Sequence, residues 1–374
     1  MSHATAEGAY VFPASFAQRR LWFIEQLEDS AGAYNVCLAL RFRGELDCPR
    51  MAEALSYLEN RHEVLRTTFA MEQGALTQVV RPPMPFPLRL EKLDSTGEGH
   101  DPALSRWLQS EVVAPFDLST GPLIRASILE TGRHEHVLVI TLHHSIVDAW
   151  SIPIMVRDLA AAYAGIREGR VPTLEALPIQ YADYAVWQVD GLTGESLERK
   201  LAYWKRQLAD PLPVLELPTD HPRPPAQTYN GARVSVDIGP EVTAAIARLA
   251  RESNATLFMA LLATFQVFLH RHSGQTDLVT GTPITGRNQP ETAGLIGFFL
   301  NTLAIRSDLS GNPAFREMLT RVRQTVLDAY AEQDLSFEKL VEALRPHATG
   351  AGIRSFKRSS CCTSPRACCR NSPG

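Results

Sequence analysis

The chain has 374 residues, of which 45% are hydrophobic and 21% charged, and 37 basic against 41 acidic residues give a formal net charge of −4. A chain of this length can bury a sizeable core, and at roughly 100–200 residues per domain it should hold about two domains. The balanced charge lacks the basic stripe typical of nucleic-acid-binding proteins, and no segment reaches the roughly 20 apolar residues that cross a bilayer. The first 25 residues show no secretory signal pattern, so a cytoplasmic location is expected.

The first half of the chain alternates strand-like and helix-like patterns. An apolar run at 36–42 predicts a strand, and the apolar spacing at 51–58 is helical. Two short apolar runs at 122–129 and 136–142 are flanked by glycine and charged residues, which predicts two strands joined by a turn. From 152 to 163 the apolar residues return to helical spacing.

The second half begins after a segment rich in proline. Six prolines lie between Pro211 and Pro225, so this segment is expected to run extended over a surface. Beyond it, 257–269 and 315–326 each carry an amphipathic helical stripe. These patterns predict a mixed α/β chain with both kinds of element in each half.

Side chains suited to chemistry gather in TLHHSIVDAWS (141–151), between a predicted strand and a predicted helix. Such a junction can hold His143, His144 and Asp148 rigidly toward a cleft. A metal site is disfavoured, because no third ligand follows at suitable spacing. An imidazole near neutral pKa can take a proton from a nucleophile or hold that nucleophile in place, but two hydrogen-bonded structural histidines would give the same pattern. Spacing alone leaves these two interpretations open.

HHSIVDAWS resembles the HHxxxDGWS signature of the condensation domains of nonribosomal peptide synthetases, and other segments resemble that family's motifs in the same order. These segments are SFAQRRLW (15–22), RHEVLRTTF (61–69), YADYAVWQ (181–188), GTPITGRNQPE (281–291), IGFFLNTLAIR (296–306) and EQDLSFEKL (332–340). The resemblance covers residues 10–346.

The resemblance implies an α/β fold of two chloramphenicol acetyltransferase-like lobes, each an α+β two-layer sandwich, in a V arrangement. The N-terminal lobe with the histidine motif is expected at residues 1–176, and the C-terminal lobe, incomplete, at 177–346. The active site of the family lies at the tunnel between the lobes.

The resemblance also implies an acyltransferase that forms an amide bond between a carrier-bound acyl or peptidyl thioester and the α-amine of a carrier-bound aminoacyl acceptor. The expected partners are donor and acceptor peptidyl carrier domains and an adenylation domain, with the substrates on the 4′-phosphopantetheine arms of the carriers. No bound cofactor, metal, nucleic acid or membrane is expected. Two alternatives stay open: a coenzyme A-dependent acyltransferase of the same superfold, and a non-catalytic binding or gating module.

The family roles are carried over onto the matching residues of the histidine motif. The resemblance implies that His144 is the general base or the group that positions the attacking amine. It implies that His143 is a structural neighbour in the catalytic motif. Asp148 matches an aspartate that pairs with an arginine, and the position matching that arginine is Arg287. We expect this pair to support the histidine loop.

One residue departs from the signature, because Ala149 stands where the family has glycine. Together with Trp150 it is expected to line the donor channel. The added methyl matters if this position needs a positive φ or borders the channel, and we expect it to narrow donor tolerance.

Residues of the other motifs are expected to serve packing. Gln18, Arg19 and Arg20 begin a helix capped by Ser15, with surface or lobe-packing roles. Ion pairs and packing are expected of Arg61, His62 and Arg66, and core positions of Trp22, Phe23, Trp187 and Phe298.

Residues 347–374 break the family pattern. They hold five basic and no acidic residues and four cysteines, Cys361, Cys362, Cys368 and Cys369, without the CxxC spacing of a zinc knuckle. Back-translated with codons ending in G or C and read two bases later, 347–365 resembles the family's missing RDxSRxPL motif and the strand after it. The hypothesis is a frameshift near residue 346 that leaves a disordered tail. Because the rest of the second lobe is then missing, we expect apolar faces at Phe265 and Val322 to be partly uncovered, and we expect low stability and impaired turnover.

Overall fold

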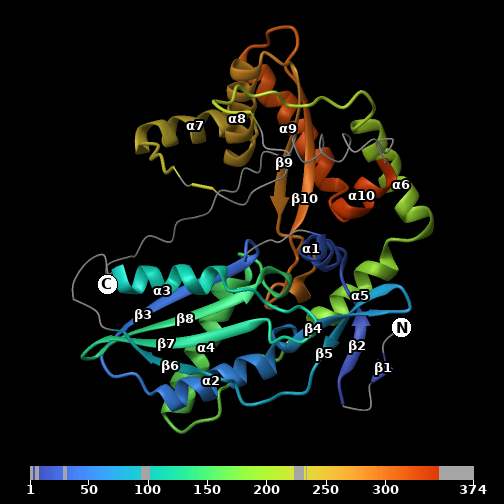
Figure 1. The fold of residues 1–374 in the computed structure, drawn as a ribbon. Coiled ribbons are helices and arrows are strands. Elements are labelled where there is room, and N and C mark those ends of the chain that lie inside the picture. Colours follow the sequence, from blue (N-terminus) through green and yellow to red (C-terminus); the bar gives the residue numbers. More distant parts are fainter. Residues whose placement is uncertain are drawn as a thin grey trace. The chain divides into compact units, whose positions relative to one another are not determined.

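The computed structural model describes residues 3–4, 8–27, 32–93, 102–222, 231–232 and 234–344 (Figure 1). The chain divides into two compact units: the first is Met1–Leu192 with Arg287–Phe299, and the second is Thr193–Gly286 with Leu300–Gly374. The first unit thus continues past residue 176, where the first lobe was predicted to end, and takes in a later segment. The predicted tail, 347–374, lies outside the described residues.

The first unit contains a four-stranded sheet that carries the histidine motif. Its order is β3 (Asn35–Arg43), β8 (Glu135–His143), β7 (Ile124–Gly132) and β6 (Arg89–Lys92), antiparallel except for the parallel pair β6 and β7. The strands predicted at 36–42, 122–129 and 136–142 are thereby confirmed.

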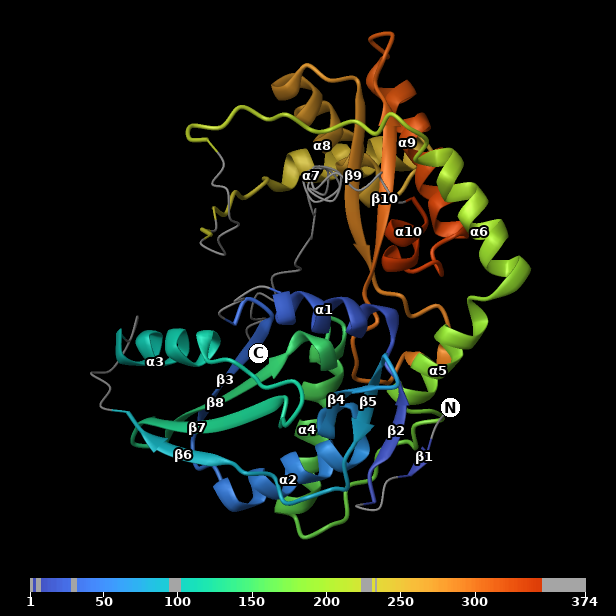
Figure 2. The same ribbon diagram turned by 45° about the vertical axis from the view of Figure 1, so that its right-hand side comes forward.

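Helices cover both faces of this sheet, as Figure 2 shows. Leu138, Ile140 and Leu142 of β8 belong to the core with α2 (Cys48–Arg61) and α4 (Ser151–Arg167). The alternate residues Val137 and Val139 pack with side chains of α3 (Pro102–Val113). Since both faces are buried, β8 is apolar without alternation, which explains its continuous hydrophobic run.

A second sheet of the first unit has the order β1 (His3–Ala4), β2 (Tyr10–Pro13), β5 (Ala75–Val80) and β4 (Thr67–Glu72), all antiparallel. The unit also holds α1 (Phe16–Leu27), α5 (Tyr181–Gly191) and the short 3₁₀ turns η1 (Glu63–Arg66), η2 (His144–Ile146) and η3 (Pro290–Thr292). Helix α1 packs against η2, which begins with the second histidine of the motif.

A buried carboxylate joins α2 to α4. Asp158 of α4 accepts hydrogen bonds from Arg61 Nε at 3.0 Å and from Arg157 Nε at 2.9 Å, and it lies 2.9 Å from His62 Nε2. The side chain of Asp158 is fully buried. The packing and ion-pair roles predicted for Arg61 are confirmed, and His62 is buried and hydrogen-bonded to the same carboxylate.

The second unit has an antiparallel pair of strands, β9 (Asp277–Ile284) and β10 (Asn301–Asp308). Its helices are α6 (Gly194–Gln207), α7 (Pro240–Glu252), α8 (Leu257–Ser273), α9 (Phe315–Ala331) and α10 (Phe337–Leu344). Both predicted helical stripes are confirmed by α8 and α9. Residues 211–222, in the proline-rich segment, form neither helix nor strand.

The burial of α9 differs from the prediction, whereas that of α8 agrees with it. Val322 of α9 is fully buried, so the expectation of an uncovered face there was wrong, because its stripe packs inside the unit. Phe265 of α8 is half-buried, whereas Leu257, Leu261 and Phe268 of the same helix are 41%, 38% and 56% exposed.

Among the described residues no single helix is long and apolar enough to span a membrane. Taken together, α7 and α8 have the length and composition of a membrane span, but the pair is bent by 107° at the break between the two helices.

Candidate active site

The histidine motif lies where strand β8 ends. His143 is the last residue of β8 and His144 begins η2, and α4 starts at Ser151. Because β8 is paired on both sides, with β3 and β7, the strand end is held rigidly. The backbone N–H of His143 donates to Leu123, and that of His144 donates to Tyr34 at 2.8 Å.

Both ring nitrogens of His143 have partners. Nδ1 lies 2.7 Å from the hydroxyl of Ser145 and accepts a hydrogen bond from the backbone N–H of Ser145 at 3.2 Å. Because Nδ1 is the acceptor, Nε2 carries the proton and faces the carboxylate of Glu25 at 3.3 Å. The residue is 2% exposed. This histidine is hydrogen-bonded on both sides and buried, as a structural histidine is.

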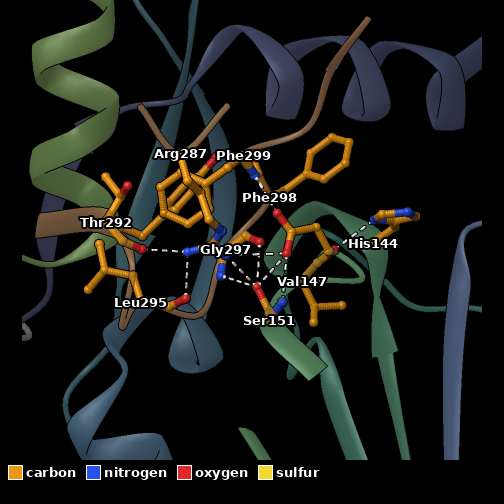
Figure 3. A network of polar contacts seen from close by, with 11 residues as sticks. His144, Val147, Ser151, Arg287, Thr292, Leu295, Gly297, Phe298 and Phe299 are labelled. Carbon is orange, nitrogen blue, oxygen red and sulfur yellow. Dashed lines mark hydrogen bonds and ion pairs between the residues drawn. The ribbon is translucent and has the colours of Figure 1, made fainter. Parts of the chain in front are cut away.

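His144 differs at its second nitrogen. Its Nδ1 lies 2.7 Å from the carbonyl oxygen of Val147, drawn in Figure 3, and since a carbonyl only accepts, Nδ1 carries the proton. The lone pair is therefore on Nε2, which has no hydrogen-bond partner in the part of the chain that the structure describes. The ring of Phe298 meets the imidazole edge-on, with centroids 4.8 Å apart.

Burial lowers the pKa of His144 below 6.5, although the Val147 carbonyl and the charge of Asp148 act in the opposite direction. The imidazole is therefore neutral at physiological pH. A neutral ring whose Nε2 lone pair is unengaged can accept a proton or a hydrogen bond from an amine.

Asp148 points into a polar network instead of toward the imidazole. One carboxylate oxygen, Oδ1, accepts from the backbone N–H of Ser151 at 2.8 Å and from Arg287 Nη2 at 3.3 Å. The other, Oδ2, accepts from the backbone N–H of Phe299 at 3.1 Å. The structure thus contains the predicted pair with Arg287, and both side chains are under 5% exposed.

Arg287 holds a second part of the chain to the same network. Its Nη1 donates to the carbonyls of Thr292 at 2.6 Å and Leu295 at 2.9 Å, and its guanidinium stacks 3.9 Å from the centre of the Phe299 ring. Figure 3 shows the guanidinium between these carbonyls and Ser151, the first residue of α4, to which Nη2 donates. The network therefore fixes the loop that carries the histidines to residues 287–299.

Ser151 also belongs to this hydrogen-bond network, although the sequence analysis did not predict a role for it. Its hydroxyl lies 2.7 Å from Asp148 Oδ1 and accepts from Arg287 Nη2 at 2.9 Å and from the backbone N–H of Gly297 at 3.1 Å. The serine follows the aspartate by three residues, a spacing at which an aspartate side chain can bond a nearby backbone N–H group in a turn. Its link to Gly297 depends on a contact distant in sequence, which that pattern does not reveal.

The two residues predicted for a donor channel lie on the outside of this loop. Ala149 is exposed and Trp150 is 56% exposed. Ala149 is not among the described residues with positive φ, so its methyl group causes no backbone strain. A place for either residue along a donor channel stays a prediction.

The predictions for aromatic and helix-start residues have mixed outcomes. Phe298 is 2% exposed as predicted, but Phe23 and Trp187, at 58% and 50%, do not belong to the core, because nothing in their own unit covers them fully. The cap on α1 is confirmed, since the hydroxyl of Ser15 accepts from the N–H of Gln18 at 3.2 Å. A surface role for Gln18 is excluded, because the residue is fully buried.

Comparison with known proteins places the chain in a family. The family model for the condensation domain matches residues 9–353. One of the linear gramicidin synthase proteins of Brevibacillus parabrevis is 47% identical over 333 residues, which are 89% of this chain and 4% of that protein.

Solved structures agree with the match. The X-domain from teicoplanin biosynthesis is similar with a TM-score of 0.82 at 30% identity, covering 89% of this chain and 73% of that one. The first condensation domain of the CDA synthetase shares the fold, with a TM-score of 0.73 at 22% identity, covering 89% and 79%.

The chain spans 4–6% of the length of the gramicidin synthase proteins that it resembles. The predicted α/β fold similar to chloramphenicol acetyltransferase is confirmed. Together with the match over residues 9–353, this shows that the chain belongs to the condensation-domain family of nonribosomal peptide synthetases, whose activity is amide-bond-forming acyl transfer.

Proposed function

We propose that this chain joins a carrier-bound acyl or peptidyl thioester to the α-amine of a carrier-bound aminoacyl acceptor, and that His144 faces the reacting amine. The observation that carries the proposal is the unengaged Nε2 of His144. Its other ring nitrogen is fixed by the Val147 carbonyl, and the adjacent His143 has both nitrogens occupied.

In the proposed step the amine nitrogen attacks the thioester carbonyl carbon. The C–N bond forms and the C–S bond breaks, so the donor carrier leaves as a thiolate. Nε2 of His144 takes the proton that the amine loses and passes it to that thiolate. Orientation of the two tethered reactants can lower the reaction barrier by ~7–11 kcal/mol, whereas general-base help typically raises the rate by about 10²–10⁴-fold. Since a thioester is already reactive toward amines, orientation can be the larger of the two contributions.

The proposed partners follow from the relatives, which are much longer synthetases. They are a donor and an acceptor peptidyl carrier domain, whose 4′-phosphopantetheine arms bring the substrates, and an adenylation domain that loads them. Ala149 and Trp150 are proposed to border the path of the donor arm. The proposed location is the cytoplasm.

The test supplies the donor in two forms. The chain is mixed with a loaded acceptor carrier and with the same acyl group either on a donor carrier or on free coenzyme A, and the product on the acceptor carrier is followed by mass spectrometry. We expect amide product with the donor carrier at a rate at least about tenfold above that with coenzyme A. Equal rates would support the coenzyme A-dependent alternative, and absence of product from both donors would overturn the proposal.

A further inference from the structure

Helix α1 contacts the residues on both sides of His144. Gln18 reaches Ser145, which follows the histidine, and Glu25 reaches His143, which precedes it. The two α1 residues lie about two helical turns apart and so project from the same face of the helix. The helix therefore holds the histidine turn at two points, one on each side of His144.

The amide of Gln18 makes two contacts at once. Its Oε1 accepts from the backbone N–H of Ser15 at 2.9 Å, which completes a reciprocal helix cap. Its Nε2 donates to the carbonyl of Ser145 at 3.3 Å. The residue is fully buried, so water does not replace either bond.

Glu25 acts through the first histidine. Its Oε1 faces His143 Nε2 at 3.3 Å, with the two side chains 20% and 3% exposed. The opposite nitrogen of that ring binds Ser145 through both its hydroxyl and its N–H. A chain of polar contacts thus runs from Glu25 through His143 to the residue that Gln18 also holds.

The turn that carries His144 is short. η2 is a single 3₁₀ turn of three residues, an element that is rarely stable on its own. Among the described residues, the imidazole of His144 has one hydrogen-bond partner, Val147, and an edge contact with Phe298. The direction of Nε2 therefore depends on the backbone at 143–147.

We propose that Gln18 and Glu25 are positioning residues that set the direction of the His144 Nε2 lone pair by holding Ser145 and His143. The consequence for catalysis rests on the proposed function, whereas the consequence for the geometry of the ring does not. Displacement of reacting groups by about 1 Å can lower a rate up to about 10²-fold.

Gln18→Glu separates positioning from helix capping. A glutamate at this position accepts from Ser15 as well as glutamine does, so the cap is kept. The ionised carboxylate cannot donate to Ser145, but burial raises the pKa of a carboxyl group, and its protonated form can donate again. We expect the rate per folded molecule to fall about 10- to 100-fold near pH 8 and to recover toward the parent rate as pH decreases.

Glu25 is tested with a pair of variants. Glu25→Ala removes the acceptor for His143, and we expect a loss of about tenfold. Glu25→Gln keeps an acceptor oxygen and is expected to recover most of that loss. Gln26→Ala, at an exposed position of the same helix, is the matched control and should leave the rate unchanged.

A second readout does not require turnover. With ¹⁵N-labelled histidine, NMR reports which ring nitrogen carries the proton, and the His144 signals are assigned by their absence in His144→Gln. We expect a single Nδ1–H tautomer in the parent chain, and mixed tautomers in Glu25→Ala and, near pH 8, in Gln18→Glu. Altered spectra in a chain that makes no amide would support the positioning role and contradict the proposed function. Unchanged His144 signals and unchanged rates in both variants would overturn the inference.

Discussion

At the scale of single residues, two adjacent histidines differ in their hydrogen bonds, through two local contacts and one that is distant in sequence. Glu25 and Ser145 occupy the nitrogens of His143, whereas Val147 engages only Nδ1 of His144. The HHxxxD spacing indicates a strand-to-helix junction, but it does not specify which nitrogen carries a proton. That depends on α1 and on the path of the η2 turn, which spacing alone does not determine.

Asp148, the aspartate of the motif, is predicted to stabilise the folded protein and to take no part in the chemical step. Asp148→Ala removes the buried partner of Arg287 and an acceptor for Ser151 and Phe299, so we expect a loss of ~3–5 kcal/mol in the free energy of unfolding. Urea unfolding followed by circular dichroism measures it. A variant that is as stable as the parent but inactive would show that Asp148 acts in the chemistry.

At the scale of elements, the continuous apolar runs predicted the strands because both faces of the sheet are buried. Amphipathic spacing likewise predicted α4, α8 and α9. Aromatic burial was predicted less well: Phe23 and Trp187 were predicted to lie in the core, yet each is at least half exposed. Burial of one side chain depends on which element packs beside it, and the sequence of one helix does not contain that information.

The segment 295–299 needs glycine at one position because of α5. A Cβ on Gly297 would lie 2.6 Å from Cε2 of Tyr181 and 2.8 Å from Cε2 of Phe299. Tyr181 cannot move aside freely, since its hydroxyl donates to the carbonyl of Phe298 at 2.7 Å. We expect Gly297→Ala to cost about 1–3 kcal/mol in stability, measured by urea unfolding.

Gly294→Ala is the matched control for this substitution. A Cβ there would lie 3.6 Å from Leu177, an ordinary van der Waals contact. Its stability should stay within about 0.5 kcal/mol of the parent. Equal losses in the two variants would mean that the Tyr181 ring is not the cause.

The link between α2 and α4 predicts a dependence of stability on pH. Burial raises the pKa of Asp158, but hydrogen bonds from His62, Arg157 and Arg61 outweigh this and lower it to about 2. The folded pKa is below the unfolded value of ~3.9, so the carboxylate stabilises the fold by about 2 kcal/mol above pH 4, and this contribution is lost as pH falls toward 2.

Asp158→Asn tests this contribution. The difference in unfolding free energy between parent and variant should be at least about 2 kcal/mol at pH 6 and should shrink between pH 4 and pH 2. Glu53→Gln, at an exposed ion pair of α2, should change stability by less than about 1 kcal/mol. A parent-to-variant difference that is constant down to pH 2 would refute the link.

At the scale of the whole molecule, each compact unit is built from two separate stretches of the sequence. Residues 287–299 belong to the first unit although they follow most of the second unit in sequence. The resemblance predicted the partner of Asp148 within this segment, because the family motif places an arginine there. Composition and periodicity could not, since nothing local to 287–299 indicates which unit it joins.

An exposed apolar stripe on α8 predicts self-association. Leu257, Leu261 and Phe268 lie on one face of the helix and are 38–56% exposed. The double variant Leu261→Gln with Phe268→Gln should lower concentration-dependent light scattering and change stability by less than about 0.5 kcal/mol per site. The single variant Leu327→Gln, at an exposed leucine on α9, should scatter as the parent does, and identical scattering from all three proteins would contradict the role of the stripe.

The proposed function depends most on Nε2 of His144, and the initial rate of amide formation between loaded carriers, measured from pH 5 to pH 8 for the parent and for His144→Ala, tests it most directly. Because the pKa of His144 is lowered by burial, we predict that the ratio of the parent rate to the His144→Ala rate falls only below about pH 6.5, as the imidazole becomes protonated. Protonation of the acceptor amine lowers both rates alike and cancels in this ratio, which we predict to be about 10²–10⁴ at pH 8. An unreduced rate in folded His144→Ala would show that the histidine neither takes the proton nor positions the amine.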